Sequence, residues 1–260
     1  MKKFLALFDL HFGFEKGYVN GKWITRPTHN LPLVKAVNKF AQDFQPDILI
    51  LGGDQLNCGP ISHWHKGKPR LDEGLRLRDE YHLLIDNILE PYNKVPEIIW
   101  LNGNHEEWIE DHIISNPSLA GLVEPKQYFS GIYNNVKFQD HGAIYKLGKL
   151  YFTHGDTILK ASNYVNPAEA LLRQTRVNIR CGHLHSYFVA SDFNTIASKD
   201  IHTSIVVPAM CQTEMFYMDR KPNKCLNGFL YGYIQDNGNF NDYVVVAVNN
   251  KFVINGVKYE

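Results

Sequence analysis

The stretch Gly103-Asn104-His105-Glu106 follows the apolar run Glu97–Leu101 after a single residue. A short apolar run of this kind predicts a buried strand, and the glycine, amide and imidazole after it predict a loop that carries ligand atoms. Four more blocks have the same arrangement, with polar residues after a short apolar run: Asp9-Leu10-His11, Gly53-Asp54, His154-Gly155-Asp156 and Gly182-His183-Leu184-His185. Because open α/β sheets gather their sites at the carboxyl ends of strands, the five blocks predict one shared site.

The chemistry of these blocks indicates a pair of metal ions. They offer only carboxylate, amide and imidazole ligands, in sufficient number to hold two divalent cations about 3.5–4 Å apart. His183 and His185 are two residues apart, so in an extended segment both point to the same side. A carboxylate between the cations is required because two dications repel strongly at that distance. Such a pair activates water and neutralises phosphoryl oxygens, so the blocks predict metal-assisted hydrolysis of a phosphoester.

The ordered set resembles the calcineurin-like metallophosphoesterase superfamily, and it looks most like the compact members found in phage and bacterial genomes. The resemblance covers Asp9 to His185. It implies an α/β fold, a four-layer α/β/β/α sandwich of two mixed β-sheets flanked by helices. It implies that one metal is held by Asp9, His11 and His185 and the other by Asn104, His154 and His183, with Asp54 bridging both. It also implies that a hydroxide bridging the metals attacks phosphorus, and that His105 contacts the phosphate and assists the leaving group.

Two departures from the sequence pattern of the superfamily narrow the range of substrates. Phosphoprotein phosphatases of the superfamily have an Asp-Arg pair after the second block and an Arg after Gly-Asn-His-Glu. Here those positions hold Asn57-Cys58 and Glu107-Trp108. Without arginines to clamp the phosphoryl group, a phosphoserine or phosphothreonine phosphatase is disfavoured.

Composition is typical of one globular enzyme domain. The chain has 260 residues, of which 44% are hydrophobic, and its formal net charge is zero, so no overall field favours nucleic acid or an anionic membrane. We expect a single domain, 1–260, without linker or repeat. The cysteines Cys58, Cys181, Cys211 and Cys225 contain no Cys-x-x-Cys pair, which indicates reduced thiols. Because the apolar N-terminal run is too short for a signal peptide and no stretch reaches transmembrane length, we expect a cytoplasmic protein, or one of the host cytoplasm if it is phage-encoded.

The apolar patterns alternate between strand and helix and then become mostly strand. The predicted strands are Phe4–Phe8, Asp47–Leu51, Glu97–Leu101, Val136–Phe138, Ala143–Leu147, Leu150–Thr153, Ile179–Cys181, Ile205–Val207, Phe229–Ile234, Tyr243–Val248 and Phe252–Ile254. The three from 136 to 153 are predicted to form a meander with a turn at Gly148-Lys149. Helices are predicted over Leu33–Phe44 and Leu77–Leu89.

Two segments are not required by the metal blocks. The segment 57–78 follows Asp54 and is a possible substrate-facing insert, in which His63, Trp64 and Arg70 are candidate substrate contacts. An ordinary solvated loop is equally compatible with it. The segment 211–227, with Met215, Phe216, Tyr217, Met218 and Arg220, either walls the site or forms core and turn. Asp156 can orient a ligand imidazole or form a turn, and isolated histidines such as His141 are expected outside the site.

Three functions are compatible with these residues. The favoured one is a phosphomonoesterase or phosphodiesterase that acts on a nucleotide-like substrate. A DNA or RNA nuclease with the same catalytic core is the alternative, and a non-catalytic metal-binding scaffold is disfavoured because every ligand and His105 are present. The imidazole-rich ligands favour manganese, with iron, zinc, cobalt or magnesium as alternatives. The expected partner is thus a phosphoester, either a small molecule or a nucleic acid, and no membrane partner is expected.

Overall fold

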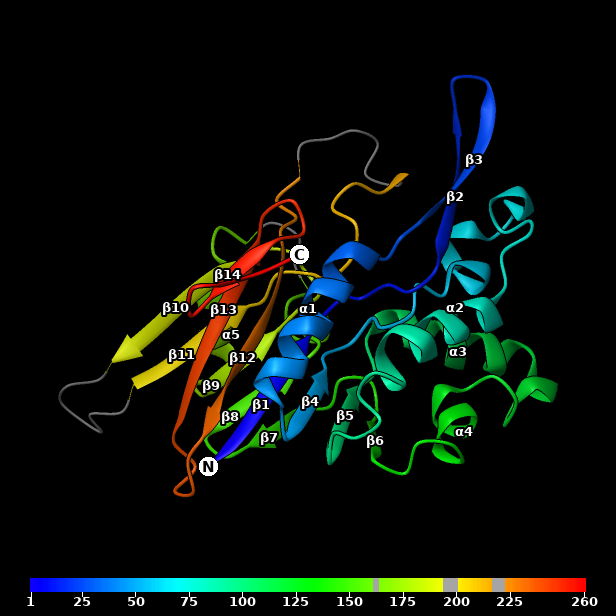
Figure 1. The fold of residues 1–260 in the computed structure, drawn as a ribbon. Helices are drawn as coiled ribbons and strands as arrows, with labels where there is room; N and C mark the ends of the chain where they lie inside the picture. Colours follow the sequence, from blue (N-terminus) through cyan, green and yellow to red (C-terminus); the bar gives the residue numbers. More distant parts are fainter. Residues whose placement is uncertain (161–163, 194–200, 217–222) are drawn as a thin grey trace.

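The computed structural model describes residues 1–160, 164–193, 201–216 and 223–260 (Figure 1). Within these residues two main β-sheets face each other, and helices cover the outer face of each sheet. The four-layer α/β/β/α arrangement that the sequence predicts is therefore confirmed. Tyr217, Met218 and Arg220 of the 211–227 segment lie outside the described residues.

The first sheet has six strands in the order β13-β12-β1-β4-β5-β6. The strands are β1 (Lys2–Leu7), β4 (Ile48–Leu51), β5 (Glu97–Leu101), β6 (Val136–Gln139), β12 (Asn227–Ile234) and β13 (Phe240–Ala247). The four strands from β1 to β6 run parallel, whereas β12 is antiparallel to both β1 and β13. The carboxyl ends of β1, β4 and β5 consequently meet at one edge.

The second sheet has the order β10-β11-β9-β8-β7. Its strands are β7 (Tyr145–Leu147), β8 (Leu150–Thr153), β9 (Asn178–Cys181), β10 (Phe188–Phe193) and β11 (Ile201–Val206). The β7–β8 hairpin with its Gly148-Lys149 turn is confirmed, but the three-stranded meander is wrong. β6 pairs with β5 in the first sheet. The chain changes sheets only in the loop after Gln139, so β6 and β7 belong to different sheets.

Five α-helices lie in the described residues: α1 (Leu31–Phe44), α2 (Leu77–Leu84), α3 (Asn104–Ser115), α4 (Pro125–Ser130) and α5 (Pro167–Thr175). A π-helical turn, Ile85–Leu89, continues α2, so the predicted helix over Leu77–Leu89 is confirmed. Asn30 caps α1 by accepting a hydrogen bond from the Leu33 N–H. No described helix combines the length and the apolar character that crossing a bilayer would demand.

Alternation along β1 explains how the layers pack. Phe4 and Ala6 face the second sheet, where Phe152 packs against them, while Leu5 and Leu7 face the helices of the first sheet. On the outer side of the second sheet, α5 packs on β9 and β11. Burying each large apolar side chain contributes about 1.5–3 kcal/mol, so three contiguous apolar layers hold the strands in register.

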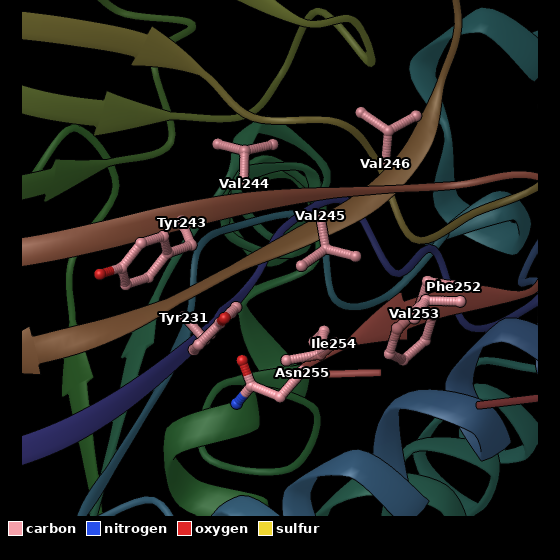
Figure 2. Close-up of a pocket in the computed structure, with 9 residues that line it drawn as sticks. All are labelled: Tyr231, Tyr243, Val244, Val245, Val246, Phe252, Val253, Ile254 and Asn255. Carbon is pink, nitrogen blue, oxygen red and sulfur yellow. The ribbon is translucent and has the colours of Figure 1, made fainter. Parts of the chain in front are cut away.

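Two small hairpins lie outside the main sheets. The hairpin β2–β3 (Phe14–Val19, Lys22–Pro27) projects away from the sheets in Figure 1, and β14–β15 (Phe252–Ile254, Val257–Tyr259) packs near α1. An open pocket of about 350 Å³ lies between β12, β13 and β14, and Figure 2 shows its lining side chains, Val245 and Ile254 among them. Its lining is mostly aliphatic and aromatic and includes no residue of the five blocks.

One buried ion pair joins the two sheets. Arg180 on β9 is 1% exposed, and its Nε donates to Asp242 Oδ2 on β13 at 2.5 Å. The same guanidinium donates to the Thr203 carbonyl at 2.8 Å and to the Thr203 hydroxyl at 2.9 Å. The charge of Arg180 is thus fully matched inside the sandwich.

We predict that Asp242→Ala destabilises the protein by about 3–5 kcal/mol, because it leaves a buried guanidinium without its counter-charge. Urea unfolding measures the effect. Asp236→Ala is the control: this carboxylate pairs with the N-terminus but its side chain is 94% exposed, so the unfolding midpoint should not change. Equal midpoints for the two variants would contradict the assigned role of the Arg180 pair.

Candidate metal centre

The strands bring all five blocks to one edge of the sandwich. Each block directly follows the carboxyl end of a strand: β1, β4 and β5 in the first sheet, and β8 and β9 in the second. The seven side chains predicted as ligands are therefore contributed by both sheets: Asp9, His11, Asp54, Asn104, His154, His183 and His185. Their donor atoms converge in two neighbouring groups.

The first group surrounds two imidazoles. His11 Nε2 lies 3.2 Å from His185 Nε2. Asp9 Oδ1 lies 3.5 Å from His185 Nε2, and Asp54 Oδ2 lies 3.8 Å from His11 Nε2. Nitrogen lone pairs and carboxylate oxygens thus face one small space.

The second group surrounds His154. Its Nε2 lies 3.1 Å from Asn104 Oδ1 and 3.3 Å from Asp54 Oδ2. His183 completes this group, since the ligand atoms of Asp54, His154 and His183 all lie within 4.8 Å of one another. Asp54 contacts members of both groups, which is the position that a shared carboxylate requires.

Backbone carbonyls orient two of the imidazoles. His105 Nδ1 lies 2.7 Å from the Asn57 carbonyl, and His154 Nδ1 lies 3.2 Å from the Gly52 carbonyl. Because a carbonyl only accepts, both Nδ1 atoms donate, so Nε2 is the ring nitrogen that faces the donor groups. His105 Nε2 is 3.9 Å from Asp54 Oδ2, and the ligand atoms of His105, His11 and Asp54 all lie within 4.8 Å of one another.

Backbone N–H groups from one block hold the carboxylates of another. The His183 N–H donates to both oxygens of Asp9 at 3.1 and 3.0 Å, and the His105 N–H donates to Asp54 Oδ1 at 2.9 Å. Asp9 and Asp54 are almost completely buried. These bonds fix the orientation of both carboxylates before any cation binds.

Glu106 has a positioning role that the sequence did not reveal. Its carboxylate accepts hydrogen bonds from the N–H groups of Asp54 at 3.0 Å, Leu56 at 3.0 Å and Gly103 at 2.8 Å. It therefore fastens the loop of the second block to the start of α3. The sequence signal for this role was the position of Glu106, three residues after Gly103 and third in a helix, where a glutamate can accept hydrogen bonds from backbone N–H groups.

The ligand loops have a strained backbone. Five of the predicted ligands have positive φ: Asp9 at 52°, His11 at 45°, Asp54 at 53°, His183 at 66° and His185 at 51°. Non-glycine residues rarely adopt this region, and such residues cluster at functional sites. Glycine is also required immediately before two of the predicted ligands, Asp54 and Asn104. A Cβ at Gly53 would overlap the His154 ring, and one at Gly103 would overlap the Asp54 carboxylate.

The electrostatics of the cluster fit bound cations. Burial is the largest cause that lowers the pKa values of His11, His105 and His183. A lowered pKa favours the neutral imidazole, which keeps a nitrogen lone pair for a cation. Burial also acts to lower the pKa of His154, but the charges of Asp54 and Asp9 outweigh it and raise this pKa to about 10. The raised pKa of His154 reflects the negative charge of the two buried carboxylates, which a bound cation would neutralise. His11 Nδ1 is buried and has no hydrogen-bond partner among the described residues.

A family model of calcineurin-like phosphoesterases matches residues 3–206, which include all five blocks. The chain belongs to the calcineurin-like phosphoesterase family. Phosphoester hydrolysis is the reaction class of this family, and its dependence on divalent metals agrees with the donor groups described above.

Solved structures of several phosphoesterases resemble this family member at low sequence identity. A phosphoesterase from E. coli is 14% identical, with 92% of this chain and 96% of that chain covered and a TM-score of 0.39. A predicted phosphoesterase from Streptococcus pneumoniae is 10% identical, with 99% and 95% covered and a TM-score of 0.38. A nuclease from Pseudomonas putida is 11% identical, with 87% and 83% covered and a TM-score of 0.36. None of the curated proteins matches this calcineurin-like phosphoesterase significantly.

Ring contacts connect two of the three candidate substrate contacts, His63 and Trp64, with the candidate metal centre of this calcineurin-like phosphoesterase. Trp108 on α3 stacks on His105 with ring centroids 3.9 Å apart, and His63 meets Trp108 at 5.1 Å. Trp64 is 69% exposed, next to His63. Arg70 lies farther along the same segment and stacks on Trp23 of the β2–β3 hairpin. The sequence pattern did not identify Trp108, although its place four residues after Asn104 puts it on the same helical face.

Three other side chains near the cluster have partners that the sequence did not predict. Asp156 bonds His141, with Oδ2 2.7 Å from Nε2, and His141 also lies 3.5 Å from Glu107. Asp156 therefore orients His141, which the sequence placed outside the site. Cys211 Sγ lies 3.6 Å from His185 Nδ1, so the described part of the 211–227 segment reaches a ligand imidazole.

We predict that Glu106→Gln weakens divalent metal binding by about 10- to 100-fold, because an amide nitrogen would then face backbone N–H groups and loosen the Asp54 loop. Calorimetric titration of the chelator-treated protein with Mn²⁺ measures the affinity. Glu110→Gln, which changes an exposed carboxylate on the same helix, is the matched control. Metal affinity that is equal in the two variants would argue against a positioning role for Glu106.

Proposed function

We propose that this chain hydrolyses a phosphoester of a nucleotide-like substrate, as a phosphomonoesterase or phosphodiesterase, with two divalent cations. The observation that carries the proposal is the convergence of seven donor side chains in two groups that share Asp54. Asp9, His11 and His185 would hold one cation. Asn104, His154 and His183 would hold the other, and Asp54 would contact both. Residues 1–260 would form a single domain, with 57–78 as a substrate-facing insert.

The bound cations would supply an activated water and would neutralise charge on the phosphoryl oxygens. The remaining roles in catalysis belong to side chains and N–H groups of the protein. Asp54 balances charge between the two groups, and the N–H groups of His105 and His183 keep the carboxylates in place. We assign His105 as the residue that contacts the phosphate and assists the leaving group, because its Nε2 faces the cluster while Nδ1 is held by Asn57.

The donor set supports manganese as the native metal. Four imidazoles beside two carboxylates and one amide are more nitrogen-rich than calcium sites, and iron, zinc, cobalt and magnesium remain alternatives. We also propose a cytoplasmic location, in the host if the protein is phage-encoded, which the four free cysteines support. Retention of every donor disfavours a non-catalytic scaffold. A nuclease remains the second candidate because the exposed side chains of Trp64, Lys66 and Lys68 follow His63 in the 57–78 segment.

We predict that the manganese-loaded protein hydrolyses aryl phosphate monoesters or diesters, and that removing the metal abolishes turnover until Mn²⁺ is restored. The assay compares a monoester, a diester, cyclic nucleotides and single- and double-stranded nucleic acids. Asp54→Asn should stay inactive after reloading, whereas Asp111→Asn, an exposed change on α3, should recover. Full turnover by metal-free protein would refute the proposal.

We predict that His105→Asn keeps both metals but lowers turnover by about 10² to 10⁴-fold, the usual cost of losing a positioned proton donor. The deficit should be smaller for nitrophenyl phosphate, whose leaving group departs without a proton, than for an alkyl phosphate. Metal content by elemental analysis and rates with both substrates decide the matter. Loss of metal, or equal deficits with both leaving groups, would show that His105 is a ligand or only an electrostatic contact.

A further inference from the structure

A succession of aromatic rings leads from the metal cluster to the surface. His105 and Trp108 are 3.9 Å apart at 31°, Trp108 and His63 are 5.1 Å apart at 87°, and His63 and Trp64 are 4.5 Å apart at 39°. The succession ends at Trp64, which is 69% exposed. Rings that are partly open to solvent offer faces on which planar groups can stack.

Positive charge gathers along the same surface. The segment 57–78 lies beside the β2–β3 hairpin, because Arg70 stacks on Trp23 and Lys16 bonds Glu73 at 3.1 Å. We name residues 14–27 and 57–78 together the arm. Figure 1 shows the hairpin projecting next to the short helical turns of 59–71.

Each acidic residue of the arm is paired with a basic residue or a histidine of the arm. Glu15 bonds Arg26 at 2.7 Å, Glu73 bonds Lys16, and Asp72 lies 2.6 Å from His65. Lys22, Lys66, Lys68 and Arg70 have no ion pair within the described part of the chain, and all four are exposed. In a chain of zero net charge this is a local basic surface, and phosphates are its natural counter-charge.

We propose that the arm binds a single-stranded polynucleotide, with bases stacked on Trp64 and the rings behind it and phosphates along the exposed cations. The proposal rests on the proposed function, and it narrows the nucleotide-like substrate to a nucleic acid, the substrate of the second candidate. A mononucleotide would use one ring and one or two cations, whereas this surface offers several of each. A duplex keeps its bases stacked on one another, so only an unpaired strand can present base faces to these rings.

The test is binding of a fluorescent phosphorothioate oligothymidylate, about ten nucleotides long, to the manganese-loaded protein, because this backbone resists hydrolysis. Fluorescence anisotropy gives Kd and its salt dependence. Trp64→Ala should weaken binding by about 5- to 150-fold, the range for one lost base stack. Trp64→Phe should retain most of the affinity. Lys66→Ala should lower the slope of log affinity against log salt by about 0.7.

Tyr243→Ala removes an exposed aromatic ring from β13, outside the arm, and should leave strand affinity unchanged. The inference is overturned if Trp64→Ala binds like the wild type, if a duplex binds as tightly as the single strand, or if free thymidylate competes as well as the oligonucleotide. Aryl phosphate hydrolysis is measured in parallel. Turnover without strand binding overturns this inference alone, and strand binding without metal-dependent turnover overturns the proposed function alone.

Discussion

Burial of two carboxylates, Asp9 and Asp54, is the constraint on which the rest of the structure depends. A buried charge is costly unless it is hydrogen-bonded and paired. The N–H of His183 bonds Asp9, and the N–H of His105 bonds Asp54, while His154 lies within contact of Asp54. Each carboxylate is thus satisfied by a block from a different strand. The relative position of the two sheets, and not only of adjacent strands, is therefore set by the charges at their common edge.

This arrangement carries backbone strain that the core must support. Residues at positive φ cost about 1–3 kcal/mol each, and five predicted ligands adopt it. The strands beneath these loops are among the most buried parts of the chain, with Phe4 and Phe152 packed between the sheets. Because close-packed interiors transmit strain and scarcely deform, the loops can keep donor atoms close together although those atoms repel or compete for the same space. A bound cation would remove much of that conflict, so metal binding and loop stability are coupled.

The sequence predicted the parts of the structure that depend on local pattern. Apolar runs located β1, β4, β5, β8 and β9, and the polar residues after them located the seven side chains that converge at the edge of the two sheets. Periodicity contains no information on which sheet a strand joins, so β6 was assigned to the wrong partner. The sequence did not predict the β2–β3 hairpin because its strands contain no buried apolar run, although Asn20-Gly21 is a strong hairpin turn signal. The sequence did not reveal the role of Glu106, because its partners Asp54 and Leu56 are remote in sequence and contact it only in the folded protein.

The structure separates the predicted metal ligands from the residues of the arm. The donors stand on loops fixed by two sheets, whereas the arm is held by surface contacts such as Arg26 over Phe216 and Arg70 over Trp23. Surface contacts of this kind contribute little to global stability, so the exposed residues of the arm can change without disturbing the carboxylates, whereas the buried Asn57 at its start holds His105. The two regions meet at the stack of Trp108 on His105. Trp108 is anchored on α3, the same helix whose first turn carries Asn104 and Glu106. A ligand that stacked on these rings would therefore lie against the helix that carries Asn104 and Glu106, and it would contact the same helix as the predicted metal ligands.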